Sequence, residues 1–424
     1  MKKDFFLTPE LSRNDLGALI YEEVSLTDLA QAYGTPCYVY SKSAICQAWQ
    51  EFDDAFKPLS ALICYAVKAN SNLSLLRLLA RLGAGFDIVS GGELARVLAA
   101  GGDPRKIVFS GVGKSIAEIE QALQAGILCF NVESLPELER LSNIASGLGR
   151  SAPISLRVNP DVDPKTHPYI STGLKQSKFG IAYESALALY DHARTLPGIE
   201  ITGIDCHIGS QITTLPPLLE ALERILQLVE HLDSRGIPLH HLDLGGGLGI
   251  RYRDEQPIAL STYAQEIAQR LRHFPGRLLL EPGRRIMGNS GLFLTRVEYY
   301  KTTPDRRFVI VDGAMNDLIR PALYDAWHEI VPVQARDIAE ELVDVVGPVC
   351  ETGDILASQR KLAVSQGDLL AILSTGAYGS SMGSNYNARP RPTELLVDGK
   401  QVYVIRRRET LDALCSHEWP IIEV

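Results

Sequence analysis

A short apolar run, a polar or glycine-rich corner and an amphipathic stretch follow one another repeatedly between residues 60 and 285. Short apolar runs between turn residues predict strands, and apolar positions three and four apart predict helices. The eight expected strands are Leu62–Val67, Gly85–Val89, Lys106–Phe109, Ile127–Val132, Ile154–Val158, Ile199–Cys206, Leu239–Leu244 and Arg277–Leu280. The seven expected helices are Ser74–Leu82, Glu93–Ala100, Ser115–Ala125, Leu135–Leu148, Ser185–Leu196, Pro216–Arg235 and Ser261–Phe274.

A glycine follows each expected helix. These glycines are Gly83, Gly101, Gly126, Gly149, Gly198, Gly236 and Gly276. Glycine adopts the left-handed conformation that often ends a helix without steric penalty, so each one predicts a helix terminus.

The alternation of strand and helix predicts an α/β fold. Strands separated by helices are expected to run parallel with right-handed crossovers, and eight of them can close into a (β/α)8 TIM-like barrel. An open doubly wound sheet is the alternative, although six strands are more usual for it. We predict the barrel over residues 42–287.

The pattern changes after Ile286, where strand-like runs lie between turn residues with little helical periodicity. These runs are Thr295–Tyr300, Phe308–Val311, Leu342–Val346, Leu369–Leu373 and Glu394–Arg406. Within the last run, Asp398-Gly399 predicts a two-residue hairpin turn. We expect a mostly β domain built from residues 1–41 and 288–424, in which Cys37–Tyr40 supplies a strand.

Composition and charge favour a globular protein that acts on a small molecule. The chain has 424 residues, of which 46% are hydrophobic and 22% charged, so it can bury a core. Its net charge is −9, and its longest basic run is Arg406–Arg408, which argues against a nucleic-acid partner. No apolar run approaches the ~20 residues that a membrane span requires.

The cysteines and the first residues predict a cytoplasmic location. The seven cysteines are odd in number, widely scattered and without a C-x-x-C pair, which is typical of a reducing compartment and predicts neither disulfides nor a zinc site. The first residues lack the sustained apolar stretch of an export signal.

Two glycine-rich segments resemble nucleotide-binding motifs without matching them. The segment Ser110–Ser115 ends like a P-loop, but Val108 stands where that motif requires glycine. The segment Gly245–Gly249 is not a dinucleotide fingerprint, because Ile250 occupies the place of the last glycine. We therefore expect no nucleotide site of either type.

The residues that follow the expected strands are the candidates for chemistry, because barrel enzymes place their active sites at the C-terminal ends of the strands. Lys68 follows the first strand, where partial burial would favour a nucleophilic amine. The glycines at 245–247 follow the seventh strand, and their bare amides could hold a phosphate. A solvated lysine and a tight turn are the alternatives at these two places.

Two further corners fit a pyridoxal cofactor. Glu281, after the eighth strand, could bind a protonated ring nitrogen, although an ion pair with Arg284 is the alternative. His207, after the sixth strand, could lie flat against the ring or could be a core histidine. A lysine, a phosphate cradle, a carboxylate and a histidine together favour a Schiff-base cofactor site.

Several motifs resemble those of the pyridoxal-phosphate-dependent decarboxylases with an alanine-racemase-like barrel, and of the diaminopimelate decarboxylase family in particular. In the barrel they are Tyr65–Asn70, His207–Gln211, Gly245–Gly249 and Glu281–Arg284. Downstream they are Asn316–Tyr324, Gly347–Asp354 and Gly376–Met382. The resemblance covers nearly the whole chain, and the one departure is Thr352 where serine is usual.

The resemblance implies a set of residues that hold pyridoxal 5'-phosphate. Lys68 would form the Schiff base, His207 would stack on the ring, and Glu281 would contact the ring nitrogen. The phosphate would be held by Ser210, Gly245, Gly246 and Gly247 and by the loop of Glu281, Pro282, Gly283 and Arg284.

The resemblance also implies the substrate site and a homodimer. Arg284, Arg320 and Tyr324 would bind the distal carboxylate of meso-diaminopimelate, and Glu351 its distal ammonium. Cys350 would donate the proton that replaces carbon dioxide, and Tyr378 would contact both cofactor and substrate. Cys350 and Glu351 are expected to come from a second subunit.

Three alternatives remain open for the function. Another basic amino-acid decarboxylase or an amino-acid racemase could use the same scaffold. A pyridoxal-phosphate carrier would need the barrel but not the downstream β domain. A sugar-phosphate enzyme without a cofactor could use the same type of barrel.

Overall fold

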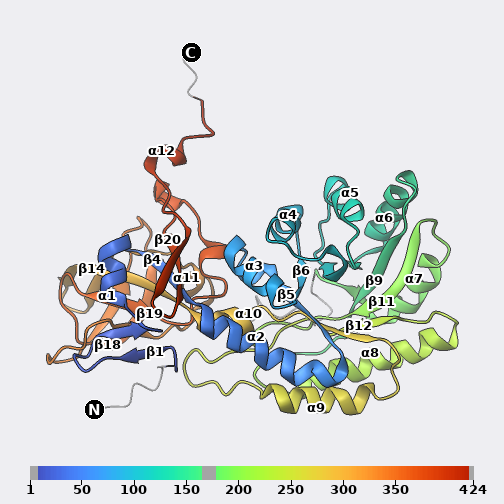
Figure 1. Ribbon diagram of the computed structural model, residues 1–424, viewed down its shortest axis with the longest axis horizontal. Coiled ribbons are helices and arrows are strands. Elements are labelled where there is room, and N and C mark those ends of the chain that lie inside the picture. The colour runs from blue at the N-terminus through green and yellow to red at the C-terminus, as the bar shows by residue number, and fades with distance from the viewer. Residues whose placement is uncertain (1–7, 165–177, 420–424) are drawn as a thin grey trace. The chain divides into compact units, whose positions relative to one another are not determined.

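The computed structural model describes residues 8–164 and 178–419, and these belong to two units (Figure 1). The barrel unit consists of Cys46–Arg251 and Glu255–Ile286. The β unit consists of the described residues of Met1–Ile45, Tyr252–Asp254 and Met287–Val424. No helix in the described residues is long and apolar enough to cross a membrane.

Eight parallel strands form a closed ring in the barrel unit. In ring order they are β5 (Leu62–Ala66), β6 (Gly85–Ile88), β7 (Ile107–Phe109), β8 (Cys129–Val132), β9 (Ala152–Asn159), β11 (Ile199–Asp205), β12 (His241–Asp243) and β13 (Arg277–Leu280). The ring closes where β13 pairs with β5. A short strand, β10 (Ile181–Ala182), pairs with β9 outside the ring. The predicted barrel is confirmed, and the open sheet is wrong.

Helices surround these strands (Figure 1). They are α3 (Leu73–Arg81), α4 (Gly91–Ala99), α5 (Ile116–Ala125), α6 (Leu135–Gly147), α7 (Ala186–Ala193), α8 (Pro216–Ser234) and α9 (Leu260–Leu271). All seven expected helices are present with ends shifted by a few residues. The helix α2 (Lys42–Phe56), which precedes β5, was not predicted. A short α10 (Arg284–Met287) follows β13.

Gly276 corrects one expectation about the helix ends. The other six glycines have positive φ, as predicted, but Gly276 does not. The helix α9 ends earlier, at Leu271. A Cβ at Gly276 would lie 2.8 Å from the His240 carbonyl oxygen, so this position requires glycine for a close approach rather than for a left-handed turn.

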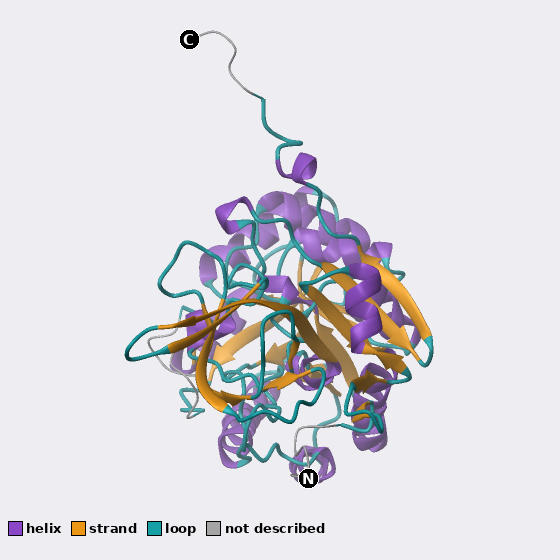
Figure 2. Ribbon diagram, turned by 90° about the vertical axis from the view of Figure 1, so that its left-hand side faces the viewer, coloured by secondary structure: helices purple, strands orange, loops and turns teal. Residues whose placement is uncertain are grey.

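The β unit contains a mixed, strongly twisted sheet, whose strands are orange in Figure 2. Its main order is β18 (Ile355–Leu362), β17 (Glu341–Val346), β15 (Arg307–Val311), β14 (Gly291–Thr302), β4 (Cys37–Ser41), β20 (Thr393–Asp398) and β21 (Gln401–Arg406). In addition, β19 (Leu369–Ile372) pairs with β14 and with β16 (Ile330–Pro332). The predicted strand at Cys37–Tyr40 is therefore confirmed as part of this sheet.

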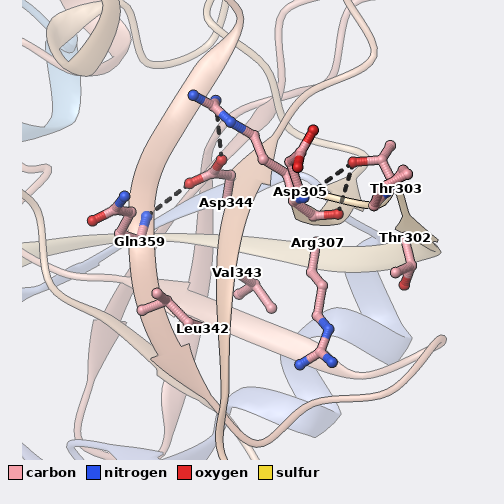
Figure 3. Close-up of a pocket in the computed structure, with 10 residues that line it drawn as sticks. Thr302, Thr303, Asp305, Arg307, Leu342, Val343, Asp344 and Gln359 are labelled. Carbon is pink, nitrogen blue, oxygen red and sulfur yellow. Dashed lines mark hydrogen bonds and ion pairs between the residues drawn. The ribbon is translucent and has the colours of Figure 1, made fainter.

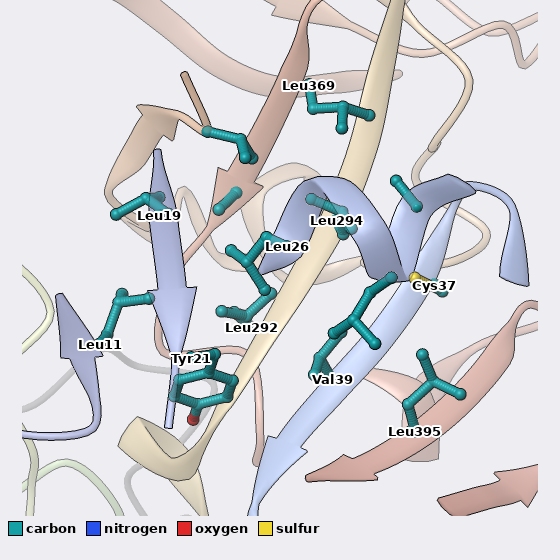
Figure 4. Packing of buried hydrophobic residues seen from close by; sticks show 14 of the residues in the cluster. Leu11, Leu19, Tyr21, Leu26, Cys37, Val39, Leu292, Leu294, Leu369 and Leu395 are labelled. Carbon is teal, nitrogen blue, oxygen red and sulfur yellow. The ribbon is translucent and has the colours of Figure 1, made fainter. Parts of the chain in front are cut away.

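An apolar core lies against one face of the strands β4, β14 and β20 (Figure 4). It includes Leu26 of α1 (Leu26–Tyr33) and residues of the small antiparallel sheet β1 (Leu11–Arg13), β2 (Leu19–Tyr21) and β3 (Val24–Ser25). Val39, Leu292 and Leu395 are almost fully buried there. The unit further contains α11 (Arg320–Tyr324) and α12 (Leu411–Leu414).

The predicted hairpin is present, but its turn lies one residue further along the chain. Asp398 pairs with Gln401, so the two loop residues are Gly399 and Lys400 rather than Asp398 and Gly399. Gly399 has a φ of 58°, which explains why glycine is needed in the loop. The strands β16 and β18 were not predicted.

Candidate active site

Lys68 lies in a single 3-10 turn, Val67–Ala69, directly after β5. Its Nζ atom is 2.5 Å from Oδ2 of Asp87, which belongs to the neighbouring strand β6. The lysine side chain is 36% exposed, whereas that of Asp87 is completely buried. The amine is therefore accessible to a ligand and carries a buried anionic partner.

The glycine run after β12 packs against the other candidate corners. Gly245 and Gly247 have positive φ values of 62° and 99°. A Cβ at Gly246 would collide with the carbonyl oxygen of Glu281. Only glycine allows this close packing, which leaves the backbone amides uncovered by side chains of their own.

The loop after β13 packs against the turn that holds Lys68. The carbonyl oxygen of Pro282 accepts a hydrogen bond of 3.1 Å from the Ala66 N–H. A Cβ at Gly283 would lie 3.0 Å from the Cβ atoms of both Ala66 and Ala69. Barrel closure thus brings the first and last corners of the barrel together.

His207 contacts the glycine run from the corner after β11. Its Nδ1 atom accepts a hydrogen bond of 3.2 Å from the Gly246 N–H. An amide can only donate, so Nδ1 bears no proton and the neutral ring carries its proton on Nε2. Burial lowers the pKa of His207 well below its usual range, and the cations of Arg157 and Lys68 lower it further.

Ser210 and Arg284 meet beside this run. The Arg284 guanidinium donates a hydrogen bond of 3.0 Å from Nη2 to Oγ of Ser210. Arg284 is only 5% exposed. A hydroxyl, a guanidinium and glycine amides in one corner form a donor set suited to an anion.

Glu281 belongs to a buried cluster of carboxylates. One oxygen atom from each of Asp205, Asp243 and Glu281 lies within 4.8 Å of the others. Glu281 accepts a hydrogen bond of 3.4 Å from the Asn131 amide. Asp205 Oδ2 lies 3.9 Å from Nε of Arg157, the nearby buried cation. We call Asp87, Asp205, Asp243 and Glu281 the acidic cluster.

Several negative charges so close together in a buried site repel one another, which favours protonation within the acidic cluster. Burial raises the pKa of Asp243 to about 7, and the charge of Asp87 also raises it. Burial and the charge of Asp243 raise the pKa values of Glu281 and Asp205 well above their usual range. Asp87 Oδ1, Asp205 Oδ1 and Asp243 Oδ2 accept no hydrogen bond within the described structure.

Asp87 and Asp205 were not among the sequence candidates. Both lie inside apolar runs that were assigned to strands as a whole. Carboxylates are rarely buried in strands without a functional or structural reason. An aspartate inside each of these apolar runs was therefore the feature of the sequence that could have identified them.

Arg320 and Tyr324 lie together in the β unit, on α11. Arg320 is 6% exposed, and its guanidinium lies 5.9 Å from the centre of the Tyr324 ring and 5.0 Å from that of Tyr252. Tyr378 is half-buried in a loop of the same unit and has a φ of 57°, a strained value for tyrosine.

Cys350 and Glu351 are exposed on a loop of the β unit. The backbone N–H of Cys350 donates to Oδ1 of Asn387 at 2.8 Å, and Glu351 accepts a hydrogen bond of 2.9 Å from the Tyr386 hydroxyl. The Cys350 backbone and the Glu351 carboxylate are therefore held by the neighbouring residues Asn387 and Tyr386.

Two other features contain none of the predicted site residues. Lys114 of the P-loop-like segment is buried and pairs with Glu137 at 2.7 Å, which makes it a structural residue. Figure 3 shows a polar pocket of about 390 Å³ in the β unit, lined by residues that include Thr302, Arg307 and Asp344. None of the predicted site residues lines this pocket.

Comparison with known proteins gives a consistent result. A model of the family described as "pyridoxal-dependent decarboxylase, pyridoxal binding domain" matches residues 42–288. The diaminopimelate decarboxylase of Neisseria meningitidis serogroup B is 58% identical over 400 residues, which cover 94% of this chain and 97% of the relative.

Solved structures agree with this result. Diaminopimelate decarboxylase from Helicobacter pylori, complexed with L-lysine, is 46% identical with a TM-score of 0.89, covering 92% of this chain and 98% of the other. The enzyme from M. jannaschii, also in complex with L-lysine, is 38% identical with a TM-score of 0.93, covering 97% and 98%.

Proposed function

The chain belongs to the diaminopimelate decarboxylase family of pyridoxal-dependent enzymes, and from this premise we propose how its residues carry out the reaction. The enzyme is a carboxy-lyase that converts meso-2,6-diaminopimelate to L-lysine and carbon dioxide, the last step of lysine biosynthesis. The observation that carries this conclusion is the 58% identity to a diaminopimelate decarboxylase over 94% of the chain.

The barrel residues fit pyridoxal 5'-phosphate. The acidic cluster is a buried, negatively charged environment with acceptor atoms that have no hydrogen bond, which suits a protonated ring nitrogen. Lys68 offers an accessible amine. The run of Gly245, Gly246 and Gly247 carries no side chains, so a phosphate can approach its backbone closely, although the N–H groups of Gly245 and Gly246 already donate to Asp243 and His207. We assign Lys68 to the covalent link and Glu281 to the ring nitrogen.

Ser210 and the Pro282–Arg284 segment complete the proposed phosphate site. Ser210 Oγ already accepts a hydrogen bond from Arg284, so its own proton can point to a phosphate oxygen. Gly283 lets the loop approach the Lys68 turn closely. His207, held by the Gly246 amide, provides a neutral flat surface for the ring.

When bound, the cofactor supplies an electron sink for the pair of electrons left by the departing carboxylate. The positive charge of a protonated ring nitrogen would offset the repulsion within the acidic cluster and allow Glu281 to carry the balancing negative charge, so each group would favour the charged form of the other. Asp87 holds the Lys68 ammonium at 2.5 Å whenever the amine is not covalently engaged. Neutral His207 adds no positive charge that would compete with the ring nitrogen for the carboxylates.

The β domain, which we assign to residues 1–41 and 288–424, would recognise the end of the substrate that does not react. Arg320, with Arg284 and Tyr324, would bind the distal carboxylate through charge-assisted hydrogen bonds. Glu351 would accept the distal ammonium. Tyr378 would contact both cofactor and substrate. Ornithine lacks the distal carboxylate and would leave the buried Arg320 without that partner, so it should be a poor substrate.

We further propose that the enzyme acts as a homodimer in which Cys350 and Glu351 enter the active site of the partner subunit. Both residues are exposed on a loop of the β unit in the single chain, as residues that contact a partner subunit would be. Cys350 would protonate the α-carbon after carbon dioxide leaves.

A cytoplasmic location is also part of this proposal. All seven cysteines are free thiols, and a reducing compartment keeps them so. The substrate and cofactor are small metabolites, consistent with a net charge of −9 and no large basic run.

The experiment that tests the function is incubation of the purified enzyme with meso-diaminopimelate and chromatographic detection of lysine. Lysine should form with the parent enzyme and not with Lys68→Ala. Ornithine and arginine should release no carbon dioxide. Turnover of either of them at a comparable rate would favour a general basic amino-acid decarboxylase, and interconversion of stereoisomers without carbon dioxide would favour a racemase.

A further inference from the structure

His328 is a buried histidine that contacts the proposed substrate-binding arginine. The Arg320 Nε atom donates a hydrogen bond of 3.4 Å to His328 Nε2. Both side chains belong to the β unit, and the ring of His328 is completely buried. Tyr252, which lies against the Arg320 guanidinium, also packs edge-on against His328 with ring centres 5.2 Å apart.

The two hydrogen bonds of His328 define its protonation state. Its Nδ1 atom lies 2.9 Å from the carbonyl oxygen of Leu373, which can only accept. Its Nε2 atom faces Nε of Arg320, which can only donate. The neutral ring with its proton on Nδ1 satisfies both partners, whereas a doubly protonated ring would point a proton and a positive charge at Arg320.

The backbone around His328 is fixed by sheet pairing. His328 lies two residues before β16, which pairs with β19. The Leu373 N–H donates 2.8 Å to the Glu329 carbonyl oxygen, continuing that pairing. Arg360 donates from Nη2 to the carbonyl oxygen of His328 at 3.1 Å. The acceptor that faces Arg320 is therefore held by a rigid part of the sheet.

We propose that His328 is a positioning residue that orients Arg320 toward the distal carboxylate of the substrate. A guanidinium is planar, so a hydrogen bond at Nε and contact with the Tyr252 ring together fix both its rotation and its plane. This inference rests on the proposed role of Arg320 and adds a specificity-determining contact to it. The bond acts on binding of the carboxylate and not on the breaking carbon-carbon bond.

A pair of substitutions separates the two hydrogen bonds of the ring. The amide nitrogen of His328→Asn can replace Nδ1 and keep the bond to Leu373, but it leaves Arg320 without its acceptor. The longer side chain of His328→Gln can place an oxygen near the position of Nε2 and keep the bond to Arg320. If the hydrogen bond from Arg320 to His328 orients Arg320, the His328→Asn variant should have a KM for meso-diaminopimelate about tenfold above that of the parent, with little change in kcat. The KM of the His328→Gln variant should stay near the parent value.

Two inhibitors provide a readout that loss of folding would not produce. L-lysine retains the distal carboxylate, whereas cadaverine lacks it. We expect His328→Asn to weaken competitive inhibition by L-lysine by about the same tenfold factor and to leave inhibition by cadaverine unchanged. His241→Asn is the matched control, because His241 is also a buried histidine but bonds to Ser155 inside the barrel unit. Its KM should not change.

The outcomes distinguish this inference from the proposed function. If Gln impairs L-lysine binding as much as Asn does, or if neither variant changes KM, His328 does not position Arg320. If Arg320→Ala itself leaves the KM unchanged, the substrate role of Arg320 is wrong, and lysine production by the parent enzyme still tests the reaction. Should His328→Asn not fold, the two inhibitors tested on His328→Gln supply the test. Gln keeps the acceptor for Arg320, so inhibition by L-lysine and by cadaverine should both stay near the parent values, and a selective loss of inhibition by L-lysine would overturn the inference.

Discussion

The ammonium of Lys68 lies 2.5 Å from the carboxylate of Asp87, a buried residue on the adjacent strand of the barrel. This ion pair joins the proposed covalent link of the cofactor to the acidic cluster. The Lys68 amine must leave the cofactor and bind it again in each turnover. Its fixed anionic partner, Asp87, keeps the free amine in one defined and accessible position, ready for the second of these steps.

Borohydride reduction of the holoenzyme should attach the cofactor to Lys68 alone. Lys114 also follows a barrel strand, but its pairing with Glu137 at 2.7 Å and its burial exclude it from the reaction. Peptide mapping by mass spectrometry measures the site of attachment. Labelling of Lys114, or an unchanged level of labelling in Lys68→Ala, would contradict the assignment.

Gly246→Ala should weaken cofactor binding by at least about tenfold, because the new methyl group collides with the Glu281 carbonyl oxygen and displaces the phosphate donors. Gly113→Ala is the control, since a Cβ at Gly113 meets nothing within 4 Å. Fluorescence titration of the cofactor-free proteins measures the two affinities. Equal affinities for both variants would argue against a glycine cradle.

Glu281→Gln should lower kcat by roughly a hundredfold, because the neutral amide no longer stabilises positive charge on the ring nitrogen. The variant should still bind the cofactor through Lys68, which its absorbance spectrum reports. A kcat close to that of the parent would remove Glu281 from the proposed position.

Asp243→Asn should stabilise the cofactor-free protein increasingly as the pH rises. The pKa of Asp243 is raised to about 7 by burial, so the folded state holds a proton that the unfolded chain releases near pH 4. The stabilisation that the folded state gains by holding this proton is fully present below about pH 4 and is lost as the pH rises through 7. Asparagine has no such loss, and its oxygen can still accept the Gly245 N–H.

Thermal melts at pH 5 and pH 8 measure this effect. The melting temperature of Asp243→Asn relative to the parent should increase between these two values by about 3 °C or more. The histidines with lowered pKa values are common to both proteins, so their effect cancels in the comparison. A difference that shrinks toward pH 8 would mean that Asp243 is ionised at little cost in the fold.

Mixing Lys68→Ala with Cys350→Ala should restore activity if the active site is shared between subunits. Each variant alone should be nearly inactive. Random re-association of the two gives mixed dimers with one intact site each, and about a quarter of the parent activity. No recovery after subunit exchange, verified by mass spectrometry, would place both residues in the same chain's site.

Much of the barrel could be predicted because its strands are short apolar runs with clear boundaries. The helix α2 was missed although Ile45, Trp49, Phe52 and Phe56 are spaced for one apolar face, since it precedes the first repeat. The strand β18 was missed because the polar run Ser358–Lys361 conceals its alternation.

The residues of the site could be suspected one by one, but their contacts could not be derived from spacing. Asp87, Asp205 and Asp243 meet because the ring of strands closes, and no local pattern encodes that closure. The contact between Arg320 and His328 depends on the chain turning at Asp325, whose φ is 51°. Such contacts follow from the tertiary structure rather than from periodicity.

The position of β4 between β14 and β20 determines the order in which the two units can form during synthesis. This strand leaves the ribosome before the barrel sequence, while both of its neighbours leave after it. The barrel sequence is almost continuous and can fold as it emerges, whereas β4 has to remain unpaired until its neighbours are made. During that interval the nascent chain exposes an apolar strand edge, which is where we expect chaperones to bind.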